Sequence, residues 1–491
     1  MVKRSTENPA PEAESSQALL QRREFLGGTA ALLGLAAGCS SDDAQEETGP
    51  TFRPGDVPES TALFPRTVMA GEMKPESFWV SGHVSSAERV TLRVWQGDPD
   101  ARVISEQRIT PDARGFLKAK VEGLQGGQWY GYALFTGEAT AGFEARSLIG
   151  RVRTALPDGS TEPVRIAIAA CIGRGVIPEY IDPDNLQPVE IWDTMRQASK
   201  ADYDVFIHLG DQGYLDKVYK AGGSLEQYLA AWGALHGGGY REVYPRTGLY
   251  ATWDDHEVTN NSSVDPWTTD PDERARIENA QRAYFTVMPI DAADPKVDHL
   301  WRSFRWGDTV EFIVLDCRYE RQPLESGVYL SDEQFQFLLD RLQNSPCRFK
   351  CVLNSVPFSN LGLSDVDPIL AQLVDPNDRW QGYATQRAEL QAFVDEHELS
   401  NILWITGDVH MCFVGQVDPN PTTRGEGMWE VCVTSGNINP LANKIPEEQF
   451  PWRSEEAHLP LITFDPASDS VLVEFVATDG SIAHSRALNL G

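Results

Sequence analysis

The feature of this sequence that most constrains its fold is a repeated pattern in which a short apolar run ends in a polar residue. The run at 402–405 is followed by Thr406 and Gly407 and then delivers Asp408 and His410. Upstream runs end in the same way, at Cys171, Asp211, Asp255, Asp316 and Asn354. Runs of this length are typical of buried strands, and open α/β sheets bind ligands at the carboxyl ends of their strands. We therefore expect these polar side chains to meet in one crevice.

Residues 160–491 alternate strand patterns with helix patterns. Helices are predicted at 187–199, at 331–342, where Ser331 and Gln334 form a capping box, and at 385–398. Strands that alternate with helices indicate an α/β core. The last part of the chain instead indicates antiparallel strands, which predicts a mixed sheet or a second packed sheet.

Residues 63–156 show a different pattern, short alternating runs separated by glycine, proline and aspartate. Strands at this regular spacing, without helical periods, predict a β-sandwich of the immunoglobulin or fibronectin type. The segment contains no group of residues that indicates chemistry.

The first 62 residues are predicted to be an export signal and a tether. In residues 1–39, Arg22 and Arg23 precede a short apolar stretch and then Cys39. The apolar part is too short to span a bilayer. It resembles a twin-arginine signal that ends in a lipoprotein processing site, although Ala36 stands where that site prefers leucine. We expect export to the periplasm or cell surface by the export machinery, with a membrane anchor if Cys39 is lipidated, and a disordered, polar tether at 40–62.

Charge and cysteine content narrow the function further. The chain has 42 basic and 72 acidic residues and a net charge of -30, so nucleic-acid binding is not expected. An anionic substrate would need bound cations to attract it. Of the seven cysteines, the five that follow residue 300 lie in or beside apolar runs and are predicted to be buried thiols, although a disulfide involving Cys347 is left open.

Two motifs in the α/β region combine residues that bind metals. Asp211 and Tyr214 stand three positions apart, a carboxylate that can bridge two cations and a phenol that trivalent iron can deprotonate near neutral pH. Residues 253–257 read WDDHE, which places His256 directly after Asp255. With GDVH at 407–410, these motifs predict a metal centre.

Together, GDQGY, WDDHE and GDVH, with the phrases ACIGRG, LDCRYER and DRWQGYATQR, resemble the alkaline phosphatase D (PhoD-like) family of metallophosphoesterases. The resemblance covers the chain from about residue 63 onward. It implies a metallophosphoesterase-type αββα sandwich behind the N-terminal β-sandwich. It also implies a phosphoester hydrolase that acts on phosphomonoesters, phosphodiesters or both through a metal-activated water.

The resemblance also assigns roles to individual residues. It implies an Fe³⁺ site made of Cys171, Asp211, Tyr214 and His410. Asp211 would bridge to one or two divalent ions, Ca²⁺ in the family pattern, with further ligands from Asp255, Asn354 and Asp408. Asp255 stands where the family has asparagine, and Asn260 or Asn261 is an alternative to Asn354. His256 would contact the leaving group or a phosphoryl oxygen. Arg318 and Arg387 would bind phosphate, or form structural ion pairs instead.

Two other functions stay open at this point. One is a phosphodiesterase or phospholipase-D-like enzyme that acts on cell-envelope polymers or lipids. The other is a non-catalytic surface-binding lipoprotein that uses the β-sandwich for adhesion. In the hydrolase interpretation, substrate specificity would come from three segments that we expect to be loops, 172–190, 215–247 and 262–300.

Overall fold

The computed structural model describes residues 52–86, 89–140, 142–260, 267–363 and 375–491. The predicted signal at 1–39 and most of the predicted tether therefore lie outside the described residues. From Thr51 to Gly491 the chain forms one compact unit. Within the described ranges, no helix combines the length and the apolar character that crossing a membrane would require.

The larger sheet has nine strands in the order β21-β20-β19-β9-β10-β11-β1-β2-β5. Its centre is parallel and consists of β9 (Val164–Ala169), β10 (Val205–His208) and β11 (Gly248–Ala251). On one side lie the antiparallel strands β19 (Leu459–Asp465), β20 (Ser470–Val476) and β21 (Ile482–Leu488). On the other side lie β1 (Met69–Lys74), β2 (Ser77–His83) and β5 (Phe116–Glu122).

The second sheet has seven strands in the order β12-β13-β14-β15-β17-β16-β18. Its four central strands are parallel: β13 (Val310–Val314), β14 (Phe349–Leu353), β15 (Ile402–Thr406) and β17 (Trp429–Cys432). The flanking strands are antiparallel: β12 (Arg302–Trp306), β16 (Cys412–Gln416) and β18 (Trp452–Ser454). The sheet is mixed, as the sequence predicted.

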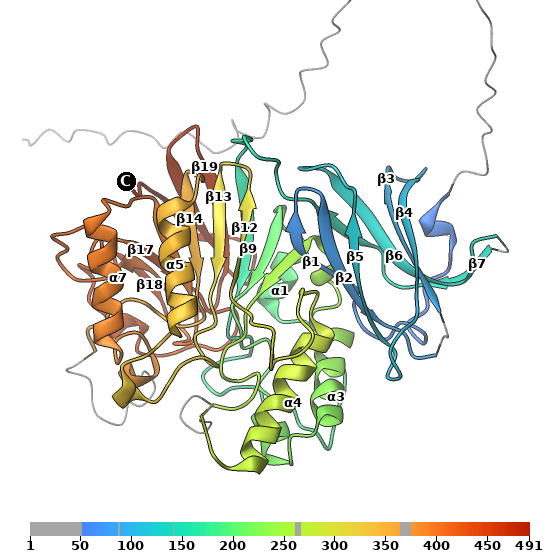
Figure 1. Ribbon diagram of the computed structural model, residues 1–491, viewed down its shortest axis with the longest axis horizontal. Coiled ribbons are helices and arrows are strands. Elements are labelled where there is room, and N and C mark those ends of the chain that lie inside the picture. The colour runs from blue at the N-terminus through green and yellow to red at the C-terminus, as the bar shows by residue number, and fades with distance from the viewer. Residues whose placement is uncertain (1–51, 87–88, 141, 261–266, 364–374) are drawn as a thin grey trace, which may run out of the picture. The chain divides into compact units, whose positions relative to one another are not determined.

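The two sheets pack face to face and helices cover their outer faces. Ile166 and Ile168 of the first sheet share a buried core with Phe312 and Leu403 of the second. The outer face of the first sheet packs against α1 (Asp193–Ala198), α2 (Asp216–Lys220), α3 (Leu225–Gly237) and α4 (Pro271–Val287). The outer face of the second packs against α5 (Asp332–Asn344) and α7 (Ala384–Glu396) (Figure 1). These layers confirm the predicted αββα sandwich.

The remaining N-terminal strands form a five-stranded sheet that packs on β1, β2 and β5. They are β3 (Val90–Gln96), β4 (Arg102–Ile109), β6 (Trp129–Glu138), β7 (Gly142–Arg146) and β8 (Gly150–Arg153). Phe78 of β2 contacts Tyr132 of β6, with ring centroids 6.1 Å apart. Because β1 also pairs in parallel with β11, one sheet serves both the N-terminal layer and the α/β core. The division of the chain at residues 156–160 remains a prediction.

The predicted helices are present, with one shifted start and three additions among the described residues, α2, α3 and α4. The Ser331 hydroxyl accepts a hydrogen bond from Gln334 N at 3.2 Å and begins α5, as expected. The Gln334 side chain bonds Asp316 and Glu320 instead of the Ser331 backbone, so only half of the predicted capping box forms. Helix α1 begins at Asp193, later than predicted, because Trp192 is still extended, with φ -74° and ψ 153°. The expectation of loops at 215–247 and 262–300 was wrong for much of their length, since α3 and α4 lie there. The capping box of Ser224 and Gln227 is the local signal for α3.

Candidate active site

The ends of strands from both sheets meet at one cavity of about 260 Å³. Asp211 follows β10, Asp255 follows β11, and Asp408 and His410 follow β15. All four line the cavity, together with His256. Cys171, which follows β9, lies fully buried beside them. The parallel strands of the two sheets therefore bring these residues together, as the recurring sequence pattern predicted.

The first cluster combines a thiol, a carboxyl, an imidazole and a phenol. Ligand atoms of Cys171, Asp211 and His410 all lie within 4.8 Å of one another. The Tyr214 hydroxyl lies 3.2 Å from Asp211 Oδ2 and 3.0 Å from His410 Nε2. The backbone N–H of Asp408 donates to Cys171 Sγ at 3.1 Å. These four side chains are the ones that the resemblance grouped around Fe³⁺.

Four residues of the site adopt an unusual backbone conformation. The φ angles are 50° at Cys171, 53° at Asp211, 67° at Asp408 and 57° at His410. Residues other than glycine rarely adopt positive φ, and such strained positions cluster at functional sites. Each of these residues lies in a turn after a strand, and the turn directs its side chain into the site. The backbone is therefore strained at the positions whose side chains meet.

A second group of acids lies next to the first. Ligand atoms of Asp254, Asp255 and Asp408 lie within 4.8 Å of one another, and so do those of Asp211, Asp255 and His256. Asp211 thus belongs to two clusters, which is the position that a bridging carboxylate requires. Sequence analysis did not select Asp254, although the WDDHE motif places it directly before Asp255.

Asn354 and its alternatives differ in position. Asn354 is fully buried, and its Nδ2 donates to the backbone oxygen of Val356. Its Oδ1 has no hydrogen-bond partner among the described residues, so this oxygen retains its capacity to bind a cation. Asn260 lines the cavity, and Asn261 lies outside the described residues. Asp316 also ends a strand, but its Oδ1 accepts a hydrogen bond from Trp253 Nε1 at 2.9 Å, so the expectation that it reaches the crevice was wrong.

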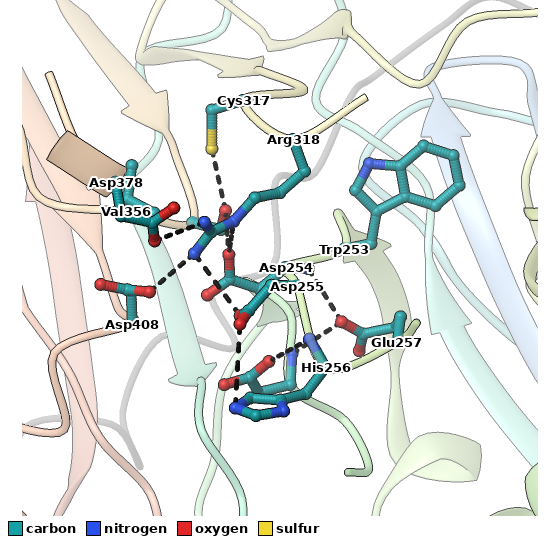
Figure 2. A network of polar contacts seen from close by, with 12 residues as sticks. Trp253, Asp254, Asp255, His256, Glu257, Cys317, Arg318, Val356, Asp378 and Asp408 are labelled. Atoms are coloured by element: carbon teal, nitrogen blue, oxygen red, sulfur yellow. Dashed lines mark hydrogen bonds and ion pairs between the residues drawn. The ribbon is translucent and has the colours of Figure 1, made fainter. Parts of the chain in front are cut away.

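Arg318 lies at the centre of four carboxylates (Figure 2). Its Nε donates to Asp254, and its terminal nitrogens contact Asp378 and Asp408, both at 2.6 Å, and Asp255 at 3.5 Å. Burial lowers the pKa of this guanidinium, but the carboxylates outweigh burial and hold the pKa well above its ordinary value. In this arrangement Arg318 balances acidic charge, and a contact with phosphate remains a proposal.

Asp378 is a second acid that sequence analysis missed, although it begins the DRWQ phrase. It accepts hydrogen bonds from Arg318 and, at 2.6 Å, from Arg321 Nη1. Burial raises the pKa of Asp378, but the two guanidinium groups outweigh burial and the net shift is downward. This pair of arginines fixes Asp378 at the wall of the cavity.

Arg387 does not reach the cavity, so its predicted contact with phosphate was wrong. Its guanidinium donates to the backbone oxygens of Phe358 at 2.9 Å and Val417 at 3.0 Å, and to Asp418 Oδ1 at 3.0 Å. The residue lies on α7, on the outer face of the second sheet, and is not among those that line the cavity. Arg387 therefore forms the structural ion pair that was the alternative.

His256 is held by a carboxylate that sequence analysis did not identify. Its Nδ1 lies 2.7 Å from Asp216 Oδ2, and its Nε2 lies 3.8 Å from Asp255 Oδ2. Burial lowers the pKa of His256, but Asp255, Asp211 and Asp216 outweigh burial and raise the pKa well above its ordinary value. The only local signal for Asp216 is its position two residues after Tyr214.

Glu257 connects two of the turns that carry the acids. Its Oε2 accepts hydrogen bonds from the backbone N–H groups of Asp211 at 3.0 Å and Asp254 at 2.8 Å, and its Oε1 accepts from Gln212 N at 2.8 Å. Glu257 is 2% exposed, and burial raises its pKa to about 7. A buried carboxylate with three backbone donors rigidly links the end of β10 to the end of β11.

The charge of the clustered acids indicates a need for cations. Burial raises the pKa of Cys171, Asp211, Tyr214 and Asp408, and repulsion from neighbouring carboxylates raises each pKa further. His256 acts in the opposite direction on Asp211, and Arg318 does so on Asp408. Such closely packed acids ionise together only when positive charge compensates them. Arg318 supplies one such charge to Asp408, while the thiol and phenol lie on the other side of the cluster. This donor set fits bound metal ions.

Comparisons with known proteins agree with this chemistry. The family model described as PhoD-like phosphatase matches residues 184–459. Alkaline phosphatase D from Bacillus subtilis (strain 168) is 24% identical, in an alignment that covers 85% of this chain and 77% of the relative.

Two solved structures share the fold. A structure of PhoD superposes with a TM-score of 0.70 at 19% identity, covering 86% of this chain and 89% of that one. A purple acid phosphatase, PPD1 from yellow lupin (Lupinus luteus) seeds, superposes with a TM-score of 0.59 at 14% identity, covering 87% of this chain and 75% of that one. Because the family model spans more than half of the sequence, the chain belongs to the PhoD-like phosphatase family, and the expectation of a metal-dependent phosphoric ester hydrolase is confirmed.

Proposed function

We propose that this protein hydrolyses phosphate monoesters, diesters or both at the cavity lined by Asp211, Asp255 and Asp408, with Fe³⁺ and one or two Ca²⁺ ions as cofactors. The observation that carries the proposal is the shared position of Asp211, whose carboxylate belongs to two adjacent clusters of metal-binding groups. A carboxylate shared by two cations is the arrangement that two-metal hydrolysis requires.

The ligand types support the two kinds of ion. A thiol, a phenol, a carboxyl and an imidazole from Cys171, Tyr214, Asp211 and His410 suit iron in its trivalent state. The carboxylates of Asp255 and Asp408 are hard oxygen ligands of the kind that Ca²⁺ prefers, and so is Asn354 Oδ1, which has no hydrogen-bond partner in the part of the chain that the structure describes. When bound, such cations lower the pKa of a water molecule and stabilise negative charge on a phosphoryl group.

We assign His256 the role of a general acid. His256 lines the cavity and its Nε2 lies 3.8 Å from Asp255 Oδ2, so an imidazolium at this position can donate a proton to the leaving oxygen of the ester. Asp216 holds the ring through Nδ1 and keeps Nε2 directed away from itself. Asp216 is therefore a positioning residue.

Arg318 has a different role in this proposal. Its contacts with Asp254, Asp378 and Asp408 join these three carboxyl groups to one guanidinium, and Asp378 and Asp408 line the cavity. A phosphoryl group that approaches this wall would exchange one of these contacts for a phosphate oxygen. We also propose that residues 1–39 direct export of the enzyme, with a membrane anchor if Cys39 is lipidated.

The test is an assay of purified protein with 4-nitrophenyl phosphate and bis(4-nitrophenyl) phosphate, before and after treatment with a chelator. We expect hydrolysis of at least one ester, loss of activity on chelation, and recovery when Ca²⁺ is restored. His256→Ala should lower kcat by about a hundredfold or more, the usual contribution of a general acid, whereas Arg387→Met, which is distant from the cavity, should not. Hydrolysis of the diester alone would favour the phosphodiesterase alternative. Full metal content without hydrolysis of either ester would favour the non-catalytic binder.

A further inference from the structure

One wall of the cavity differs in character from the acidic wall. Val176, Pro178 and Tyr180 line it from the segment that follows β9, and Ile438 and Pro440 line it from the segment that follows β17. The acids Asp211, Asp255, Asp378 and Asp408 line the same cavity. The cavity therefore combines charged, metal-binding groups with aliphatic and aromatic groups.

The backbone of residues 175–181 is fixed to two segments of the site. Gly175 forms a parallel bridge with Asn437, and Ile438 N donates to Gly175 O at 2.9 Å. Tyr180 forms a parallel bridge with Tyr214, and Ile181 N donates to Tyr214 O at 2.9 Å. The first anchor fixes the apolar residues Ile438 and Pro440, and the second fixes the segment to the turn that carries Asp211.

An ion pair braces the same segment from outside. Arg174 Nη1 lies 2.6 Å from Glu179 Oε2, and both side chains are exposed. Because residues 175–181 are anchored at both ends and Arg174 pairs with Glu179, this segment forms a defined wall of the cavity. The ring of Tyr180 lies 5.9 Å from that of Tyr214 and 6.2 Å from that of His256, so the wall begins next to the proposed chemistry.

Two neighbouring apolar side chains of this wall, Val176 and Ile177, are exposed to solvent. Val176 is 52% exposed and Ile177 is 78% exposed, and they are adjacent in the chain. Apolar area that stays accessible beside a cavity contributes free energy only when a ligand covers it, at about 25 cal/mol per Å². A chain with a net charge of -30 is poorly suited to attract extended polyanions to this wall.

We propose that Val176, Ile177, Pro178 and Tyr180, with Ile438 and Pro440, form a subsite for an apolar or aromatic substituent of the substrate. The inference rests on the proposed function, because it takes the phosphoryl group to bind at the acidic wall. The substrate class is then phosphate esters of apolar alcohols or phenols. A cavity of about 260 Å³ is smaller than the roughly 300–1,000 Å³ of most ligand pockets. It holds a phosphoryl group and a small substituent, and a longer substituent extends across Val176 and Ile177.

The experiment measures kcat/KM for 4-alkylphenyl phosphates, as monoesters and as methyl diesters, with alkyl groups from methyl to butyl. The alkyl group changes the apolar length and leaves the acidity of the phenol nearly constant, so the chemical step stays comparable. In the unaltered protein, kcat/KM should rise with each added carbon, by roughly tenfold across the series. The double variant Val176→Ser/Ile177→Ser should lose most of this rise.

Ile482→Ser is the matched control. Ile482 is 51% exposed on β21, at the far edge of the larger sheet, and its substitution should leave the rise intact. Equal kcat/KM along the alkyl series in the unaltered protein, or an equal rise in the double variant, would overturn the subsite and leave the hydrolase in place. Failure to hydrolyse any compound of the series in fully metal-loaded protein would overturn the proposed function and the subsite with it.

Discussion

Replacing Glu257 by glutamine should weaken metal binding more than it weakens the fold elsewhere. The Glu257 carboxylate accepts backbone N–H groups at Asp211, Gln212 and Asp254, and two of these residues carry acids of the candidate metal centre. The substitution keeps the size of the side chain and removes its charge and one acceptor oxygen. Since Asp211 has a φ of 53°, the turn that it occupies depends on such contacts to stay in place.

The size of the effect follows from these contacts. Glutamine has one carbonyl oxygen, so at least one buried N–H group faces the side-chain NH₂ group and loses its acceptor, at a cost of about 1–3 kcal/mol. The remaining bonds change from charge-assisted to neutral, at about 1 kcal/mol each. A total of about 3–5 kcal/mol corresponds to roughly a hundredfold to a few-thousandfold change in an equilibrium constant. We expect the apparent affinity for the divalent ion to fall by up to that factor.

The assay titrates the chelated protein with Ca²⁺ and follows both bound metal and kcat/KM, at a pH well above the pKa of about 7 that burial gives Glu257. Asp204→Asn is the matched control. Asp204 also accepts a backbone N–H, that of Arg165 at 2.9 Å, but at the opposite ends of β9 and β10. If Glu257→Gln loses stability and binds Ca²⁺ as tightly as the unaltered protein, Glu257 is only a structural residue and the reasoning is refuted.

Three further changes separate the roles of charged residues. Asp216→Asn should lower the pKa of His256, because it removes one of the carboxylates that raise this pKa. The alkaline limb of the pH profile of kcat/KM should therefore move to lower pH. A limb that does not move would contradict the assignment of His256 as the general acid. Arg318→Met should lower the free energy of unfolding by about 3–5 kcal/mol, because buried carboxylates lose their partner. Urea unfolding measures this change. An unchanged free energy of unfolding would show that the carboxylates do not depend on Arg318. Arg387→Met should lower the melting temperature by a few degrees and leave kcat/KM unchanged; loss of activity at an unchanged melting temperature would restore Arg387 as a phosphate-binding residue.

The strand-end pattern predicted much of the site because it can be read from a few consecutive residues and yet determines where those residues lie in the folded sheet. Apolar runs that end at Asp211, Asp255 and Asp408 become parallel strands, and parallel strands place their carboxyl ends at one edge of a sheet. The same rule was misleading for Asp316, which also ends a strand. There the neighbouring Trp253 takes up the carboxylate, and strand position alone does not show which neighbour a side chain meets.

The partners of the site residues were not predictable from the sequence. Asp216 acts through a hydrogen bond to His256, and Glu257 acts through hydrogen bonds to backbone N–H groups of distant turns. Both lie in or beside motifs, but nothing in the sequence shows which groups they bond. Arg387 and Arg318 looked equivalent because each lies in a phrase typical of the family. The difference arises only in three dimensions, where α7 carries Arg387 to the outer face of the second sheet and Arg318 lies among the acids.

Helices α3 and α4 were missed for a related reason. Their positions lie in segments rich in glycine and charge, where periodicity is weak. Both have N-terminal caps, from Ser224 and Asp270, which are visible in the sequence. Their stability comes mainly from packing of residues such as Trp232 and Tyr284 on the first sheet, and this burial is not a local property.

The central claim is that Cys171, Asp211, Tyr214 and His410 hold one iron ion and that Asp211 shares a second cation with Asp255 and Asp408. The most direct measurement is a crystal structure of the metal-loaded protein with anomalous diffraction recorded on both sides of the iron absorption edge. The account predicts one iron peak within bonding distance of Cys171 Sγ and Tyr214 Oη, and a second cation next to Asp255. Active protein with no iron peak at this position would contradict it.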